Sequence, residues 1–364
     1  MVCRVPHHEC LCRKIHFDVP PAELLTVVEG TITDAAPPYT VKVSKGFSLG
    51  SDSATRLPLQ GLRIKLFDDA GNAEDLTETR PGVYVTGGVI QGQVGHSYHI
   101  RLETPDGKLF ESDEDKINPV GEIENIRYEY EARTLQSSYG TLPADVFKIY
   151  LDAQTVAGDE NYVRWRFKGT YKVITHPELH ETEVIPYTPY KTPRQCSGYV
   201  VFPALGGGVL VKESECTCCT CWISQYETAP QLSDAQLVTD NGFRNVKIGE
   251  APINTETFFE KYLIEVDQMS LTRKAFEFFS LVRAQKQGAS SLFQPPSGEI
   301  RGNIRSLNST DQIVGLFWAT SIRSKSKFIL RSEVPYNLTP ITFVTEACDV
   351  QYRNASTSKP ANWE

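Results

Sequence analysis

The chain has 364 residues, of which 40% are hydrophobic and 23% are charged, and its formal net charge at pH 7 is −8. This length predicts two domains or three, with enough apolar residues to fill their cores. The acidic balance argues against a nucleic-acid-binding surface, which is normally basic, and against attraction to anionic lipid. No apolar run approaches the roughly 20 residues that span a bilayer.

Residues 1–23 contain three prolines and three cysteines, a composition that predicts a flexible leader. The first twelve residues, MVCRVPHHECLC, lack the apolar core of a signal peptide. Taken literally, this start describes a soluble protein without an export address. The alternative interpretation is that the native start is a different one.

Residues 24–118 show short apolar segments with turn residues between them. Residues 25–33 (LTVVEGTIT) are rich in β-branched side chains, and residues 62–66 (LRIKL) alternate apolar with basic side chains. Turn sequences such as DDAGN at 68–72 and PDG at 105–107 separate such segments. This spacing predicts a small β-sandwich of the immunoglobulin or transthyretin type.

Residues 119–364 predict a larger β-rich domain, so the fold is mainly all-β. Residues 185–230, rich in Pro, Gly and Cys, are expected to form a long cysteine-rich loop, and a loop of this length is usually functional or cross-linked. One amphipathic helix is expected at about 270–287, with Ser270 as its N-cap and Gly288 at its end. Its apolar stripe consists of Leu271, Ala275, Phe278, Phe279 and Val282.

Four of the nine cysteines lie between residues 216 and 221, and a fifth lies at position 196. A disulfide between adjacent Cys218 and Cys219 is disfavoured, because disulfide Cα atoms lie more than about 4.4 Å apart and neighbouring Cα atoms only about 3.8 Å. Disulfides, free thiols and a metal all remain open, and the cellular compartment decides between them. The disulfide or metal candidates are Cys196, Cys216, Cys218, Cys219 and Cys221.

The sequence supports no catalytic residue and no cofactor. The three glycines at 206–208 are not followed by the lysine and helix of a phosphate loop, and no nucleophile elbow is present. One enzymatic hypothesis is a hydrolase that acts on surface glycans. It is supported only by aromatic residues, and aromatic residues in strands usually belong to a core. These aromatic residues are Trp165, Tyr171, Trp222 and Trp318.

Several stretches together resemble one known family, the uncharacterised lipoproteins of Bacteroidetes-type bacteria whose genes neighbour SusC-like TonB-dependent transporters. The resemblance covers roughly residues 24–364 in consistent order. Its motifs are residues 25–34 (LTVVEGTITD), 38–41 (PYTV), 81–84 (PGVY), 95–98 (GHSY), 110–112 (FES), 268–278, 295–304 (PPSGEIRGNI), 315–319 (GLFWA) and 359–363 (KPANW).

This resemblance implies an exported, non-enzymatic protein that is held in the outer membrane by a lipidated N-terminal cysteine and assists the neighbouring transporter. Cys12, preceded by Leu11, is the nearest match to the family's lipid-bearing cysteine. The residues before it depart from the family pattern, because Glu9 and two histidines replace the apolar signal core. The alternative function is a metal- or redox-active protein centred on the cysteine cluster.

Overall fold

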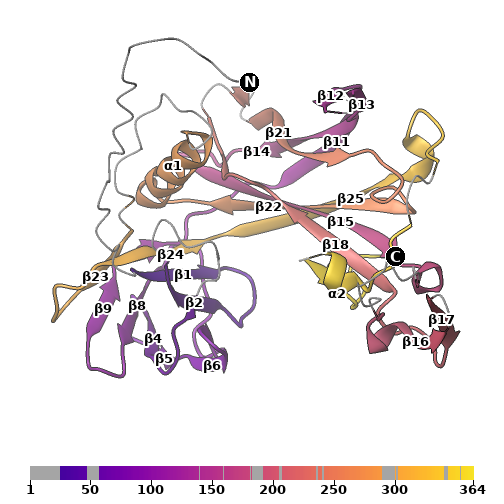
Figure 1. Ribbon diagram of the computed structural model, residues 1–364. Helices are drawn as coiled ribbons and strands as arrows, with labels where there is room; N and C mark the ends of the chain where they lie inside the picture. The colour runs from indigo at the N-terminus through magenta and orange to yellow at the C-terminus, as the bar shows by residue number, and fades with distance from the viewer. Residues whose placement is uncertain are drawn as a thin grey trace, which may run out of the picture.

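The computed structural model describes residues 25–46, 57–138, 140–158, 160–180, 182, 192–204, 207–234, 237–239, 242–288, 300, 302–339, 343–352 and 354–364. Within these ranges the protein is built mainly of antiparallel β-sheets with one long helix, as the sequence predicts (Figure 1). No helix in these ranges is long and apolar enough to cross a membrane. The expected leader, residues 1–23, lies outside the described residues.

Two six-stranded sheets face each other in the N-terminal sandwich, at the lower left of Figure 1. One sheet has the order β24-β1-β2-β7-β6, with β3 beside β2, and contains β1 (Thr26–Thr33), β2 (Thr40–Lys45), β3 (Leu57–Pro58), β6 (Thr77–Arg80), β7 (Val83–Val85) and β24 (Ile313–Thr320). The other has the order β23-β9-β8-β4-β5, with β10 beside β8, and contains β4 (Arg63–Asp68), β5 (Ala73–Asp75), β8 (Ser97–Glu103), β9 (Leu109–Ser112), β10 (Asp115–Lys116) and β23 (Ile304–Ser306). Alternate residues of these strands, such as Ile64 and Ile100, fill the core between the sheets.

Strands β23 and β24 come from the far end of the chain, which differs from the domain division expected at residue 118. β24 runs parallel to β1 along its whole length, and β23 pairs with β9. The ring of Phe317 lies over Gly30, where a Cβ atom would be only 2.8 Å from the ring, so the close approach of β24 requires a glycine. Local sequence patterns do not reveal such long-range partners, so these segments were expected in the second domain.

The second domain also contains two stacked sheets. One has the order β11-β14-β21-β20 and consists of β11 (Ile123–Glu131), β14 (Val146–Gln154), β21 (Gly242–Pro252) and β20 (Val238–Thr239). The other has the order β25-β22-β15-β18-β26, with β19 beside β15, and consists of β25 (Ile322–Leu330), β22 (Lys261–Ser270), β15 (Val163–Ile174), β18 (Thr220–Tyr226), β26 (Ala355–Ser356) and β19 (Gln231–Leu232). Trp165, Phe243 and Tyr262 are buried in the core of this domain. Two separate hairpins complete it, β12 (Thr134–Ser137) with β13 (Gly140–Pro143) and β16 (Tyr199–Ala204) with β17 (Gly207–Lys212).

The helix α1 (Arg273–Gly288) confirms the amphipathic prediction: Ala275 and Phe279 pack in one cluster with Trp318 of β24. The predicted N-cap was wrong. Ser270 is the last residue of β22, and the Ala275 backbone N–H donates instead to the Thr272 hydroxyl, at 3.3 Å. The strand therefore continues through Ser270, which is buried and whose hydroxyl donates to the Asn118 carbonyl oxygen.

The two domains are joined where β24 passes into β25. Asp34, just after β1, accepts hydrogen bonds from the Ile322 backbone N–H, the Ser321 hydroxyl and the Arg323 guanidinium. Burial alone would raise the pKa of Asp34, but these hydrogen bonds and the Arg323 charge outweigh it and lower the pKa. One continuous stretch of chain, visible as the long orange-to-yellow ribbon in Figure 1, thus belongs to both domains.

Candidate functional site

Three disulfides gather at one end of the second domain. They join Cys196 to Cys218, Cys216 to Cys219, and Cys221 to Cys348, with Cα–Cα separations of 5.6, 5.7 and 6.3 Å. All five candidate cysteines are therefore paired, and Cys218 and Cys219 have different partners. The sequence analysis did not include Cys348 among the candidates, because 127 residues separate it from Cys221 and no local spacing reveals the pair.

The described part of residues 185–230 is not an irregular loop, which corrects the sequence prediction. It contains the short 3-10 helix η2 (Gln195–Ser197), the β16–β17 hairpin and β18, a strand of the main sheet. The Cys196–Cys218 disulfide and a hydrogen bond from the Thr217 N–H to the Cys196 carbonyl oxygen fix the hairpin's base to the start of β18. The prolines and glycines of this stretch favoured the prediction of a loop, although short apolar strands lie between them.

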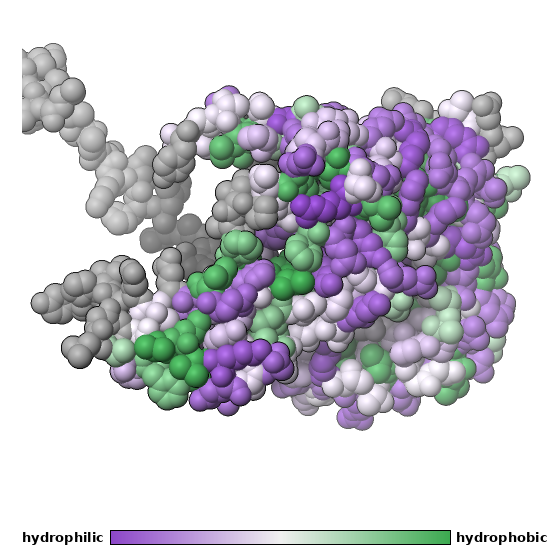
Figure 2. Space-filling view, turned by 90° about the vertical axis from the view of Figure 1, so that its right-hand side faces the viewer, coloured by the Kyte–Doolittle hydropathy of each residue, from purple (hydrophilic) through white to green (hydrophobic). Residues whose placement is uncertain are grey.

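The β16–β17 hairpin exposes an apolar face. Phe202 is paired with Val209 across the hairpin, and about half of each residue's surface is exposed, together with a large part of Val211. Figure 2 looks onto the side of the molecule that carries this hairpin and shows hydrophobic patches in the lower part of a largely hydrophilic surface. Exposed apolar side chains that lie together are typical of contact sites for other macromolecules.

The paired cysteines have no thiolate to offer a metal ion, because metals bind the deprotonated thiol and not a disulfide sulfur. The parts of the chain that the structure describes contain no group of three or more His, Cys, Asp or Glu side chains that could hold a metal. Cys12, the lipidation candidate, lies outside those parts.

A pocket of about 960 Å³ opens between the edges of the two sheets of the second domain. β18 supplies one wall and β21 the other, and Phe167 and Tyr171 of β15 lie between them. The last residue of the short helix α2 (Cys348–Gln351) and residues that follow it close one end. This volume lies in the range of small-molecule sites. The lining residues are Phe167, Tyr171, Ile223, Ser224, Gln225, Tyr226, Glu227, Thr228, Gln231, Lys247, Ile248, Gly249, Glu250, Gln351, Tyr352 and Asn354.

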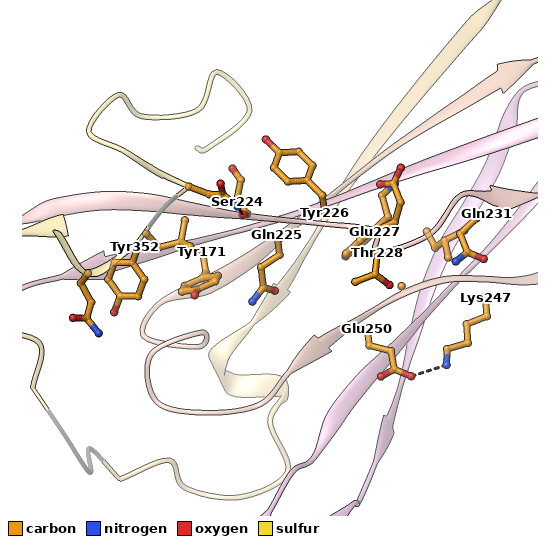
Figure 3. A pocket seen from close by; sticks show the side chains of 16 residues that line it. Tyr171, Ser224, Gln225, Tyr226, Glu227, Thr228, Gln231, Lys247, Glu250 and Tyr352 are labelled. Carbon is orange, nitrogen blue, oxygen red and sulfur yellow. Dashed lines mark hydrogen bonds and ion pairs between the residues drawn. The ribbon is translucent and has the colours of Figure 1, made fainter. Parts of the chain in front are cut away.

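The charged side chains of the pocket are paired with one another or with neighbours. Glu250 accepts hydrogen bonds of 2.7 and 2.8 Å from the Arg133 guanidinium and one of 2.5 Å from Lys247 Nζ (Figure 3). The hydrogen bonds from Arg133, with those of Lys247, lower the pKa of Glu250 to about 2. Glu227 Oε1 lies 3.1 Å from the Arg164 guanidinium, and its other oxygen accepts from the Phe167 N–H.

Tyrosine and amide side chains dominate the other end of the pocket. In Figure 3 Tyr352, Tyr171 and Gln225 lie in a row and point to the same side of the strands. Burial, together with the negative charge of Glu256, raises the pKa of both the Tyr171 and the Tyr352 hydroxyl far above its usual value. Both hydroxyls therefore stay protonated at physiological pH, and the Tyr171 hydroxyl donates to Glu256 Oε1 at 3.3 Å.

The sequence analysis named only Tyr171 among the pocket residues. Trp165 and Trp318 belong to buried cores, and the Trp222 ring packs edge-to-face on that of Trp363. Gln225 was missed because single amide residues in a strand carry no signal of function. Its role is visible only in the structure, where the Tyr262 hydroxyl donates to Gln225 Oε1 at 3.0 Å.

Comparison with known proteins gave one match. A protein-family model described as "Domain of unknown function (DUF4249)" matches residues 13–326. No curated protein and no solved structure matches the chain.

Proposed function

This chain belongs to the family described as Domain of unknown function (DUF4249), and we propose that it is a non-enzymatic accessory lipoprotein of the outer membrane. In this proposal the protein assists a SusC-like TonB-dependent transporter in the capture or uptake of a ligand. The transporter and the membrane location come from the resemblance of the sequence to lipoproteins encoded beside such transporters.

The pairing of the cysteines is the observation that carries the proposal. Six of the nine cysteines form disulfides, and the remaining three are Cys3, Cys10 and Cys12. If Cys12 is the lipidated N-terminal residue, Cys3 and Cys10 are removed with the leader. The mature protein then has no free thiol, which resolves the odd number of cysteines.

Disulfides support an exported location for a second reason. Structural disulfides persist in oxidising compartments such as the periplasm and the cell surface, and they are rare in the cytosol, where thiols are kept reduced. Three of them within one end of a single domain, one closing 127 residues of chain, fit a protein that folds after export. The same disulfides leave the five candidate cysteines without the thiolates that a metal site would require.

Two surfaces are suited to the proposed binding of a ligand and of a partner protein. The pocket between β18 and β21 has the size and the mixture of aromatic and polar groups of a ligand site. The exposed apolar face of the β16–β17 hairpin is compatible with contact to a partner protein.

Fractionation and affinity purification test this proposal. The protein, expressed in its native host with its native leader and a C-terminal tag, is expected in the outer-membrane fraction, and a TonB-dependent barrel is expected to co-purify with it. A Cys12→Ser variant serves as the matched control and is expected to leave that fraction. Recovery of the wild-type protein from the cytosol, or purification without any barrel, would overturn the proposal.

A further inference from the structure

We propose that the pocket between β18 and β21 binds a neutral oligosaccharide. The inference takes this pocket as the ligand site of the accessory protein proposed above, and in that respect it rests on the proposed function. Three properties of the pocket favour such a ligand: its charge balance, its hydrogen-bonding groups and the hydrogen bonding of its strand edge.

The charge balance disfavours a charged ligand. Glu250 is bound by Arg133 and Lys247, and Glu227 by Arg164, so an incoming charge would have to separate an existing pair to find a partner. Taking a charge out of water without a partner is strongly unfavourable. The pocket therefore favours a ligand without net charge.

The hydrogen-bonding groups exclude a purely apolar ligand. Ser224, Gln225, Thr228, Gln231, Gln351 and Asn354 line the pocket, and covering them with an apolar surface would leave polar groups unsatisfied. The Tyr262 hydroxyl donates a hydrogen bond to Gln225 Oε1, so the amide NH₂ of Gln225 is left to donate to a ligand. Sugars offer acceptors and donors around an apolar ring face, which matches a lining of amides, hydroxyls and tyrosine rings.

The strand edge favours side-chain recognition over the addition of a peptide strand. A peptide bound to a sheet edge uses the backbone groups of that edge. On β18, Trp222 and Ile223 are already paired with β26. The Ser224 N–H donates to the Asn354 carbonyl oxygen at 3.4 Å, and Asn354 Nδ2 donates to the Ser224 carbonyl oxygen at 3.3 Å. The edge of β18 is thus occupied as far as Ser224, and along this part of the strand the side chains are the groups left to recognise a ligand.

Isothermal titration calorimetry of the full-length protein tests the inference. The probes are the neutral hexasaccharides maltohexaose, cellohexaose, xylohexaose and mannohexaose, with hexagalacturonate as the charged probe and an uncharged hexapeptide as the peptide probe. At least one neutral hexasaccharide is expected to bind, and the other two classes are not. Absence of binding by every neutral hexasaccharide, or preferred binding of the acidic sugar or of the peptide, would overturn the inference.

Variants locate the binding to this pocket. Gln225→Ala and Gln351→Ala are each expected to weaken saccharide binding about tenfold, because each removes a hydrogen-bonding group from the pocket. Gln136→Ala, in the separate β12–β13 hairpin, is the matched control and is expected to bind like the wild type. Gln351 is exposed, so its variant folds even if the loss of Gln225 disturbs Tyr262. Unchanged binding in both pocket variants would contradict the assignment.

The result of the saccharide titration can be distinguished from the result of the test of the proposed function. The titration uses the purified protein and requires no transporter. A chain that co-purifies with a barrel but binds no sugar would overturn only the ligand class. A chain that binds sugar but is never found with a barrel would overturn only the accessory role.

Discussion

The disulfide between Cys221 and Cys348 fastens β18 to the short helix α2, and both residues are almost completely buried. Gln351, the last residue of that helix, and Tyr352 and Asn354 beyond it form one end of the pocket. The covalent link between strand and helix therefore also holds one wall of the pocket in place. The segment around α2, near the C-terminus, is therefore part of the proposed ligand site.

Removal of this disulfide is expected to destabilise the protein far more than removal of the Cys216–Cys219 link. In the chain-entropy model a disulfide contributes more as its closed loop lengthens, about 5 kcal/mol for the Cys221–Cys348 loop and about 1.5 kcal/mol for the short one. The two pairs close 127 and 3 residues. Thermal unfolding of Cys221→Ala/Cys348→Ala and of Cys216→Ala/Cys219→Ala measures the difference. Equal shifts in Tm would contradict this reading.

Asp34 and Glu122 bind the same guanidinium of Arg323 but are expected to differ in importance. The side chain of Asp34 is 14% exposed, whereas that of Glu122 is 65% exposed. Asp34→Ala leaves the Ser321 hydroxyl and the Ile322 N–H without their acceptor and is expected to lower the free energy of unfolding by about 2–4 kcal/mol. Glu122→Ala, as the control, is expected to lower it by less than about 1 kcal/mol. Urea denaturation measures both free energies of unfolding. A free energy of unfolding that is unchanged in Asp34→Ala would contradict the importance of this junction.

Glu250→Gln is expected to destabilise the protein at neutral pH but not in acid. The pKa of Glu250 is about 2 in the folded protein, below its ordinary value of 4.5, because Arg133 and Lys247 bind its carboxylate. A depressed folded-state pKa stabilises the protein above pH 4.5, and this contribution disappears as the pH falls towards 2. Because the site is partly exposed, solvent screening leaves about 1–2 kcal/mol at pH 7.

Urea denaturation of the wild type and of Glu250→Gln at a series of pH values measures this dependence. Subtracting one pH series from the other removes the contributions that the two proteins share and leaves that of the Glu250 carboxylate and its ion pairs. The difference in unfolding free energy should shrink steadily below pH 4.5. A difference that stays constant down to pH 2.5 would show that the ion pair with Arg133 does not form.

Gly169→Ala is expected to disrupt the core beneath the pocket. A Cβ atom at position 169 would lie 1.7 Å from the hydroxyl oxygen of Tyr262, which is buried and which orients Gln225. The ring would have to leave its site, with a loss of at least about 3 kcal/mol of stability. Gly46→Ala is the control, because its Cβ atom would make only ordinary contacts. A wild-type Tm for Gly169→Ala would be inconsistent with the described packing.

Local patterns predicted the strands and the helix, because alternation and helical spacing are properties of neighbouring residues. The alternating residues 62–66 overlap β4 (Arg63–Asp68), and the stripe of Ala275 and Phe279 forms the buried side of α1. The pairing of β24 with β1 was beyond such patterns, since nothing near residue 313 identifies a strand near residue 26 as its partner.

The pocket could not be predicted for the same reason. Gln225 lies on β18 and Glu250 on β21, and only the stacking of two sheets brings these strands to one opening. The chemistry of the cysteines could be predicted in part. Their density left disulfides, free thiols and a metal open, and the geometry of adjacent residues disfavoured a bond between Cys218 and Cys219. The pairing itself, including that of Cys221 with Cys348, is visible only in the fold.

Mass spectrometry of the mature protein isolated from its native host tests the central claim most directly. The account predicts an N-terminal lipid-modified Cys12, no thiol that reacts with an alkylating reagent before reduction, and six that react after it. These six are the cysteines of the three disulfides. An unmodified N-terminus together with free thiols among residues 196–221 would contradict the account of an exported, lipid-anchored protein.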